Sequence, residues 1–121
     1  MQLDSDICNL DLECIAFKVV WEEKWSLEKI DRIELDYRWF LQAIRLSDQD
    51  SLAPERDVDV FWHHHILDTR KYINDCNLLF GRYVHHFPYS GVLGDRDAGE
   101  QRKRYERSLV LISTLKGNAD D

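Results

Sequence analysis

Apolar residues recur at helical spacing along most of this chain. The clearest run keeps a three-four spacing with charged residues between its members: Ile30, Ile33, Tyr37, Phe40, Leu41 and Ile44. Ser26 precedes this run, and its hydroxyl can accept a hydrogen bond from a free amide at a helix start. Glu28 would then lie in the first turn, where the helix dipole favours an acid. The pattern predicts a helix that begins just after Ser26.

Three further stretches show the same periodicity. The first follows Asp11, a predicted N-cap, and should continue to about Trp21: Leu12, Ile15, Ala16 and Val19. The second follows Asp68 and Thr69, a predicted N-cap pair, and Gly81 interrupts it without necessarily ending it: Tyr72, Cys76, Leu79, Phe80 and Tyr83. The third predicts a last helix: Tyr105, Leu109 and Ile112.

The segment from Val58 to Leu67 is ambiguous, because it is apolar except for one aspartate and three histidines. It fits either a short buried helix or a strand, and we favour a helix with Asp57 as its cap. Residues 47–56 are predicted to be a surface connection, since Pro54 keeps the residue before it out of the helical region. Residues 85–97 are rich in turn-forming residues and predict a loop.

Together these elements predict an all-α protein of four or five helices around one core. A chain of 121 residues has the length of one domain, so residues 1–121 are expected to form a single helical domain. Hydrophobic residues make up 44% of the chain, which is too many for a disordered protein.

The net charge of −7 argues against binding to nucleic acid or to an anionic membrane surface. A local exception is the basic stretch Arg102 to Arg107, which fits a solvated helix face or a small basic docking patch. No apolar stretch reaches the roughly 20 residues that a membrane-spanning helix needs. The three cysteines, Cys8, Cys14 and Cys76, cannot all pair, and no signal peptide is recognised. We therefore expect a soluble cytoplasmic protein.

All five histidines lie between residues 63 and 86, together with Cys76. Imidazole and thiolate are the donors that zinc, copper and iron prefer, so the clustering indicates a transition-metal site. On a helix, residues two apart point about 200° from one another, whereas on a strand they share a face. His63 and His65 can therefore bind one ion only if the backbone is extended or the helix ends near His65. On a regular helix His63 would instead pair with Asp59.

Tyr72, Asp75 and Cys76 would share one face of the next helix. These spacings predict a metal site between two helices, with His63, His65 and Cys76 as ligands and His85 as a fourth. In this hypothesis other side chains orient the ligands or complete a polar network: Asp59, Trp62, Tyr72 and Asp75. Four protein ligands would make the ion structural, and three would leave a position for chemistry.

Structural alternatives exist for each of these residues. Cys76 lies in an apolar stripe and fits a small buried hydrophobe, and its surroundings argue against a nucleophile. His63 and His65 also fit buried imidazoles hydrogen-bonded to carboxylates, and His64 is expected to face solvent. His85 and His86 fit a loop anchor, although two imidazoles there could also complete a coordination sphere. The sequence shows no phosphate-binding glycine loop, no H-E-x-x-H and no C-x-x-C pair.

Two short motifs add a resemblance. The pattern D-x-x-W-H-x-H-x-L begins at Asp59, and Y-x-x-D-C-x-x-x-F-G begins at Tyr72. Combined, they resemble the core motif of the glycine-rich domain-containing protein family, in its short bacterial form, over about residues 25–111. The resemblance implies that four residues matter, and it leaves His64 outside: His63, His65, Asp75 and Cys76. It implies no reaction, because the activity of that family is not established.

The leading hypothesis is therefore a small helical protein with a zinc, copper or iron site, either structural or catalytic. The second is a metal-free interaction module for a protein or peptide partner, in which the motif is a buried polar network. Its function would then lie on an exposed surface such as the Arg102 to Arg107 face or the Phe87-Pro88-Tyr89 loop.

Overall fold

The computed structural model describes residues 2–47, 52–86 and 94–119. Within these ranges it contains six helices and no strand, which confirms the all-α prediction. The helices are α1 (Ser5–Cys8), α2 (Glu13–Glu23), α3 (Leu27–Leu46), α4 (Arg56–Leu67), α5 (Thr69–Phe80) and α6 (Asp95–Ala119). The one helix without a counterpart in the sequence pattern is the single turn α1.

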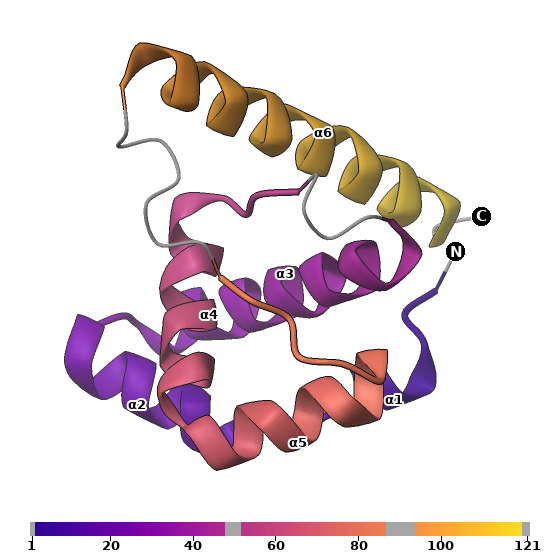
Figure 1. The fold of residues 1–121 in the computed structure, drawn as a ribbon. Helices are drawn as coiled ribbons and strands as arrows, with labels where there is room; N and C mark the ends of the chain where they lie inside the picture. Colours follow the sequence, from indigo (N-terminus) through magenta and orange to yellow (C-terminus); the bar gives the residue numbers. More distant parts are fainter. Residues whose placement is uncertain (1, 48–51, 87–93, 120–121) are drawn as a thin grey trace.

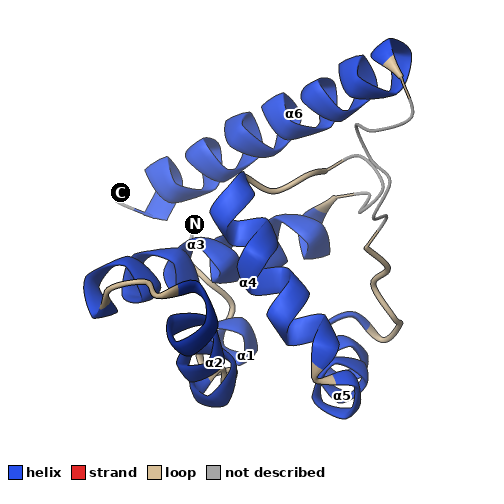
Figure 2. Ribbon diagram, turned by 90° about the vertical axis from the view of Figure 1, so that its left-hand side faces the viewer, coloured by secondary structure: helices blue, strands red, loops and turns tan. Residues whose placement is uncertain are grey.

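Helix α3 is the centre of the fold, because α1, α2, α4 and α6 all pack against it. Figures 1 and 2 show α6 along one side of the molecule and α5 on the opposite side, with α4 running between them. Helix α4 also packs on α2 and on α5. The histidine-bearing helix therefore has neighbours on three sides.

The main core is built from the predicted apolar stripes. All six apolar positions of the clearest run are buried on α3, and they meet Phe61 and Trp62 of α4 and Tyr72, Cys76 and Leu79 of α5. Burying large apolar side chains is the dominant favourable term in folding. The stripe that the sequence shows most clearly is thus the one around which the other helices pack.

Two predicted helix caps are confirmed. The Ser26 hydroxyl accepts a hydrogen bond from the Lys29 amide at 3.0 Å, and the Asp68 carboxylate accepts one from the Lys71 amide at 3.4 Å. The predicted cap at Asp57 is wrong, because α4 begins two residues earlier with Glu55 at the N-cap position. Gly81 ends α5 with a φ of 68°, a left-handed conformation that glycine adopts without strain.

Part of the predicted surface connection is buried. Ala53 is 4% exposed, and its amide donates a hydrogen bond to the Ser108 hydroxyl of α6 at 2.9 Å. Helix α6 covers this segment, which the local sequence could not reveal. Residues 48–51 and 87–93, and with them the Phe87-Pro88-Tyr89 loop, lie outside the described residues. Helix α6 begins at Asp95, slightly before the predicted end of the loop.

Helix α1 is held by partners far along the chain. The guanidinium of Arg45 lies 2.7 Å from Asp4 and 2.6 Å from Asp6, and it also donates to the Leu79 carbonyl of α5. Hydrogen bonds from Arg45 lower the pKa of both carboxyl groups. A four-residue helix is too short to be stable alone, so these contacts account for its formation.

In the ranges that the structure covers, no helix has both the length and the apolar character needed to cross a membrane.

Candidate metal centre

The backbone through the three adjacent histidines is a regular helix. Successive side chains on α4 therefore point in different directions, and His63 is exposed whereas His64 and His65 are 5% and 1% exposed. The expectation that His64 faces solvent is wrong, because α2 packs on that side of α4 and Glu23 lies 3.2 Å from His64 Nε2. His63 and His65 do not share a face.

His65 belongs to a buried polar network rather than to an open site. Its Nε2 lies 2.8 Å from the Asp75 carboxylate, and its Nδ1 lies 2.6 Å from the Tyr37 hydroxyl. A carboxylate can only accept, so Nε2 donates to Asp75 and Nδ1 accepts from Tyr37. Lys71 completes the arrangement at 3.0 Å from Asp75. Both ring nitrogens are engaged, and neither offers a free lone pair to an ion.

Burial lowers the pKa of His65, although the hydrogen bond with Asp75 acts in the opposite direction. The neutral ring is therefore the form that the fold favours. Burial also raises the pKa of Tyr37 well above its ordinary value, which keeps this hydroxyl protonated as the donor to His65. The network is held in one hydrogen-bonding pattern.

Cys76 is also buried, with 2% of its surface exposed. Burial raises the pKa of its thiol, although hydrogen bonds from the Val84 backbone and Tyr72 oppose this. Because the thiolate is the form that binds metals and attacks substrates, the structure disfavours both roles. The reading of Cys76 as a small buried hydrophobe fits its surroundings better.

Across the described part of the chain, one group of three histidine, cysteine or acidic side chains has ligand atoms close enough to hold an ion: Asp59, His63 and His86. Their ligand atoms lie within 4.8 Å of one another. His86 Nε2 donates to one oxygen of Asp59 at 2.5 Å, and His63 Nε2 lies 4.0 Å from the other oxygen. We call these three residues the His-Asp cluster.

Local sequence explains how the His-Asp cluster forms. Asp59 and His63 are four residues apart on α4, the spacing that places them on one face, as the sequence predicted. His86 arrives from the segment after α5, where Gly81 turns the chain back toward α4. There the ring of His86 packs on Trp62 and on His63, with ring centroids 4.4 Å apart in both cases.

The buried network helps to position His86. The Tyr72 hydroxyl accepts a hydrogen bond from the Trp62 indole at 3.0 Å and donates one to the Val84 carbonyl at 2.5 Å. Val84 is 2% exposed, so the chain is anchored two residues before His86. Trp62 and Tyr72 thus support the cluster without lying in it.

The predicted ligand set is therefore divided. His63 lies in the His-Asp cluster, His65 and Cys76 lie in the buried network, and His85 is exposed with its ring against Tyr83. Asp59 moves from a supporting role to a candidate ligand. The sequence pattern does not single out His86 as a ligand, and the available signal is the pairing of Asp59 with His63, which marks the face of α4 that His86 reaches.

The separations within the cluster are close to those of a coordination sphere. Zinc lies about 2.0–2.2 Å from imidazole nitrogen and carboxylate oxygen, so neighbouring ligand atoms on one ion are about 3 Å apart. The observed 2.5 and 4.0 Å lie on either side of that value.

Comparison with protein families identifies the chain. Residues 17–109 match the UCP032817-like family, which covers most of the sequence. The chain belongs to this family. The name of the UCP032817-like family states no activity, so we infer the function from the geometry of the candidate site. No curated protein and no solved structure matches the chain.

Membership in the UCP032817-like family corrects the resemblance to the glycine-rich domain-containing family. Half of the defined positions in the two motifs that carried the resemblance are buried where α4 meets α5: Trp62, His65, Tyr72, Asp75 and Cys76. Short motifs of this kind reflect the packing of a helix pair, and they do not by themselves identify a family.

Proposed function

We propose that this protein binds a divalent transition-metal ion through the His-Asp cluster, with three protein ligands and at least one open coordination position. The observation that carries the proposal is the convergence of three ligand atoms within 4.8 Å from two separate parts of the chain. His63 and Asp59 come from α4, and His86 comes from the segment after α5.

The donor set indicates which ions fit. Two imidazoles and one carboxylate suit borderline divalent ions such as zinc, iron or copper better than calcium or magnesium, which prefer oxygen ligands alone. The side chain of His63 is 53% exposed, so the cluster is open to solvent on that side. An ion with three protein ligands could take a substrate oxygen in its open position and polarise it as a Lewis acid.

Protons should compete with the ion. His86 Nε2 now carries the hydrogen that it donates to Asp59, and a metal ligand must offer a lone pair at that atom. Binding through Nε2 therefore requires the proton to move to Nδ1 or to leave, and a protonated His63 would be unable to bind. We expect weaker binding as the pH falls, with protons released on binding at acidic pH.

The test is metal binding by protein prepared without a histidine tag. Isothermal titration with zinc, and metal content by mass spectrometry, should show one ion per chain. His63→Ala, His86→Ala and Asp59→Asn should each weaken zinc binding by about tenfold or more.

The matched control is His85→Ala, which removes an adjacent imidazole that lies outside the His-Asp cluster. It should leave zinc affinity unchanged. Equal losses for His85→Ala and His86→Ala, or a wild-type chain that takes up no zinc, iron or copper, would contradict the proposal.

A second candidate function is an interaction module, favoured by an apolar groove between α2 and α3. The groove measures about 520 Å³, and Phe17 and Leu27 on its walls are 73% and 74% exposed. Its charged lining is mainly acidic: Asp11, Glu13, Asp31 and Glu34, against Arg38 alone. Charge complementarity favours one occupant, an amphipathic helix of a partner protein with basic residues beside its apolar face.

This second function can be tested with two peptides that share their apolar positions and carry either lysine or glutamate at the polar positions. By fluorescence anisotropy the lysine peptide should bind more tightly, and Phe17→Asp should abolish its binding. Leu78→Asp alters a residue that is 65% exposed on α5 and should have no effect. Equal binding of both peptides, or none of either, would rule this function out.

A further inference from the structure

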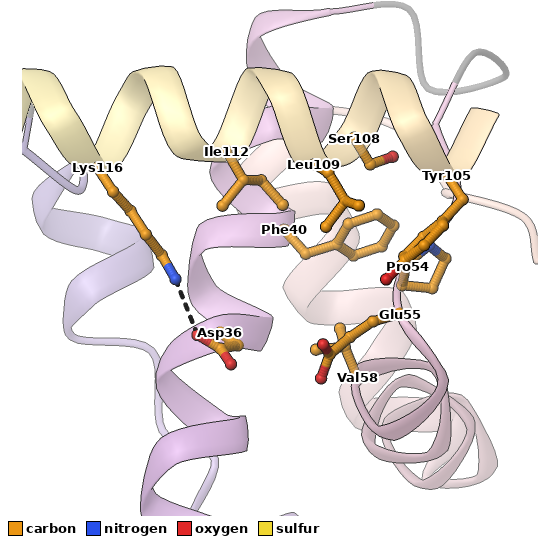
Figure 3. Close-up of a pocket in the computed structure, with 10 residues that line it drawn as sticks. All are labelled: Asp36, Phe40, Pro54, Glu55, Val58, Tyr105, Ser108, Leu109, Ile112 and Lys116. Carbon is orange, nitrogen blue, oxygen red and sulfur yellow. Dashed lines mark hydrogen bonds and ion pairs between the residues drawn. The ribbon is translucent and has the colours of Figure 1, made fainter. Parts of the chain in front are cut away.

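A small cavity lies on the opposite side of α4 from α5, where α6 crosses α3 and the start of α4. It has a volume of about 100 Å³. Figure 3 shows its walls, most of which are apolar or aromatic: Phe40, Pro54, Val58, Tyr105, Leu109 and Ile112. Small-molecule sites are commonly apolar hollows with a few placed polar groups. This cavity matches that description on a small scale.

Three charged side chains complete the lining, and two of them are negative whereas one is positive. The Lys116 ammonium lies 3.0 Å from the Asp36 carboxylate, so these two charges neutralise each other. The Glu55 backbone carbonyl accepts a hydrogen bond from the Asp59 amide, but its carboxylate makes no hydrogen bond or ion pair with any residue in the part of the chain that the structure describes. The cavity therefore carries one carboxylate in excess.

The hydroxyl of Ser108, another polar group at the cavity, is already satisfied. The Ser108 hydroxyl accepts a hydrogen bond from the Ala53 amide at 2.9 Å and donates one to the Arg104 carbonyl at 3.0 Å. Ser108 is also 2% exposed, which leaves it little room for another partner. Glu55 is thus the charged side chain of the lining that is available to a ligand, and the Tyr105 hydroxyl is a neutral polar group beside it.

Glu55 is available because of where α4 begins. It occupies the N-cap position, but its side chain makes no capping hydrogen bond. In Figure 3 its carboxylate points into the gap between α3 and the start of α4, below Phe40, Leu109 and Ile112. Burial raises the pKa of Glu55, the charges of Asp36 and Asp57 raise it further, and the charges of Arg32 and Lys116 oppose this in part. A cation beside this carboxylate would offset both effects.

We infer that this cavity binds a small organic ammonium, a primary amine carried by one ring-sized apolar group, with Glu55 as its counter-ion. The apolar group would lie against Phe40, Leu109 and Ile112. The rings of Phe40 and Tyr105 add attraction for a cation, because the face of an aromatic ring is electron-rich. An anionic ligand would face Glu55 and Asp36, and a neutral one would leave Glu55 without a partner.

The test compares three probes of equal size: benzylamine, benzyl alcohol and benzoate. Each is titrated into the full chain and followed by shifts in two-dimensional NMR spectra. Benzylamine should bind with millimolar affinity and shift signals from α6 and the start of α4. Benzyl alcohol should bind about tenfold more weakly, and benzoate should not bind.

Two variants and a control make the result specific. Glu55→Gln keeps the size of the side chain and should reduce benzylamine affinity about tenfold, to that of benzyl alcohol. Leu109→Trp should fill the cavity and abolish binding of both probes. Glu106→Gln removes an exposed carboxylate of α6 outside the cavity and should change nothing. Equal affinity for benzylamine and benzyl alcohol, unchanged binding in Glu55→Gln, or no binding at all would overturn the inference.

Discussion

At the scale of single residues, the hydroxyl of Tyr72 joins three segments around the candidate site. It accepts a hydrogen bond from Trp62 on α4 and donates one to the Val84 carbonyl in the segment after α5. Both bonds are buried, so water cannot replace them easily. One oxygen atom thus connects α4, α5 and the segment that carries His86.

Tyr72→Phe should therefore destabilise the protein by about 1–3 kcal/mol, because it leaves the Trp62 indole and the Val84 carbonyl without partners. Urea unfolding measures this change. Zinc affinity should fall as well, since the chain before His86 loses its anchor. Tyr83→Phe is the control, because that side chain is 38% exposed and should change stability by less than about 0.5 kcal/mol.

His65 predicts how stability depends on pH. Burial lowers its pKa in the folded state, so between that pKa and the unfolded value of about 6.5 the unfolded chain binds more protons. Stability from the neutral ring is then complete above pH of about 6.5 and is lost as the pH falls below it. Asp75 and Asp68 favour the charged ring and moderate this loss, whereas Lys71 adds to it.

Urea unfolding at a series of pH values from neutral to acidic tests this prediction. Wild type should lose free energy of unfolding more steeply than His65→Gln, which is neutral throughout and should be less stable at neutral pH. Parallel curves for the two proteins would show that His65 does not contribute to acid sensitivity.

At the scale of elements, α5 shows how a helix end determines the candidate site. Gly81 adopts a φ of 68° and turns the chain back toward α4, which brings His86 against Asp59. A β-carbon there would meet nothing within 4 Å, so the constraint is the backbone angle and not space. A helix continuing through Gly81 would carry His86 away from α4.

Gly81→Ala should cost about 1 kcal/mol, because a residue with a β-carbon is strained in the left-handed conformation. Gly99→Ala is a matched control in α6, where a β-carbon also has open space and the backbone is helical. It should stabilise the protein by about 0.5–1 kcal/mol. Thermal unfolding of both variants measures the difference, and a loss of stability in Gly99→Ala would contradict the argument.

The helices themselves were predictable from local signals, because their stripes and caps lie in adjacent residues. Ser26 and Asp68 act as the sequence indicated. Helix α1 was not predictable, since Arg45 holds it from about 40 residues away along the chain. The predicted start of α4 is wrong because it assumes a capping side chain, whereas the helix begins after Glu55, whose side chain makes no capping hydrogen bond.

At the scale of the whole molecule, the candidate site depends on how distant segments pack together, which the sequence pattern does not show. The sequence confined the chemistry to residues 59–86 and gave the pairing of Asp59 with His63. It did not give the path of the chain after α5, which brings His86 to α4 and leaves His85 exposed. It also did not show that α6 and the start of α4 enclose a cavity, because those segments are about 50 residues apart.

The connection between Asp59 and His86 has a consequence for the motions of the whole fold. These residues are 27 positions apart, and all of α5 lies between them. An ion on the His-Asp cluster would close that stretch into a ring, so separation of α5 from α4 would gain less conformational entropy while the ion stays bound. Amide hydrogens of α5 should then exchange more slowly with zinc present, while those of α6 keep their rate. Such an ion would stabilise the packing of α5 on α4, whatever chemistry takes place at its open coordination position.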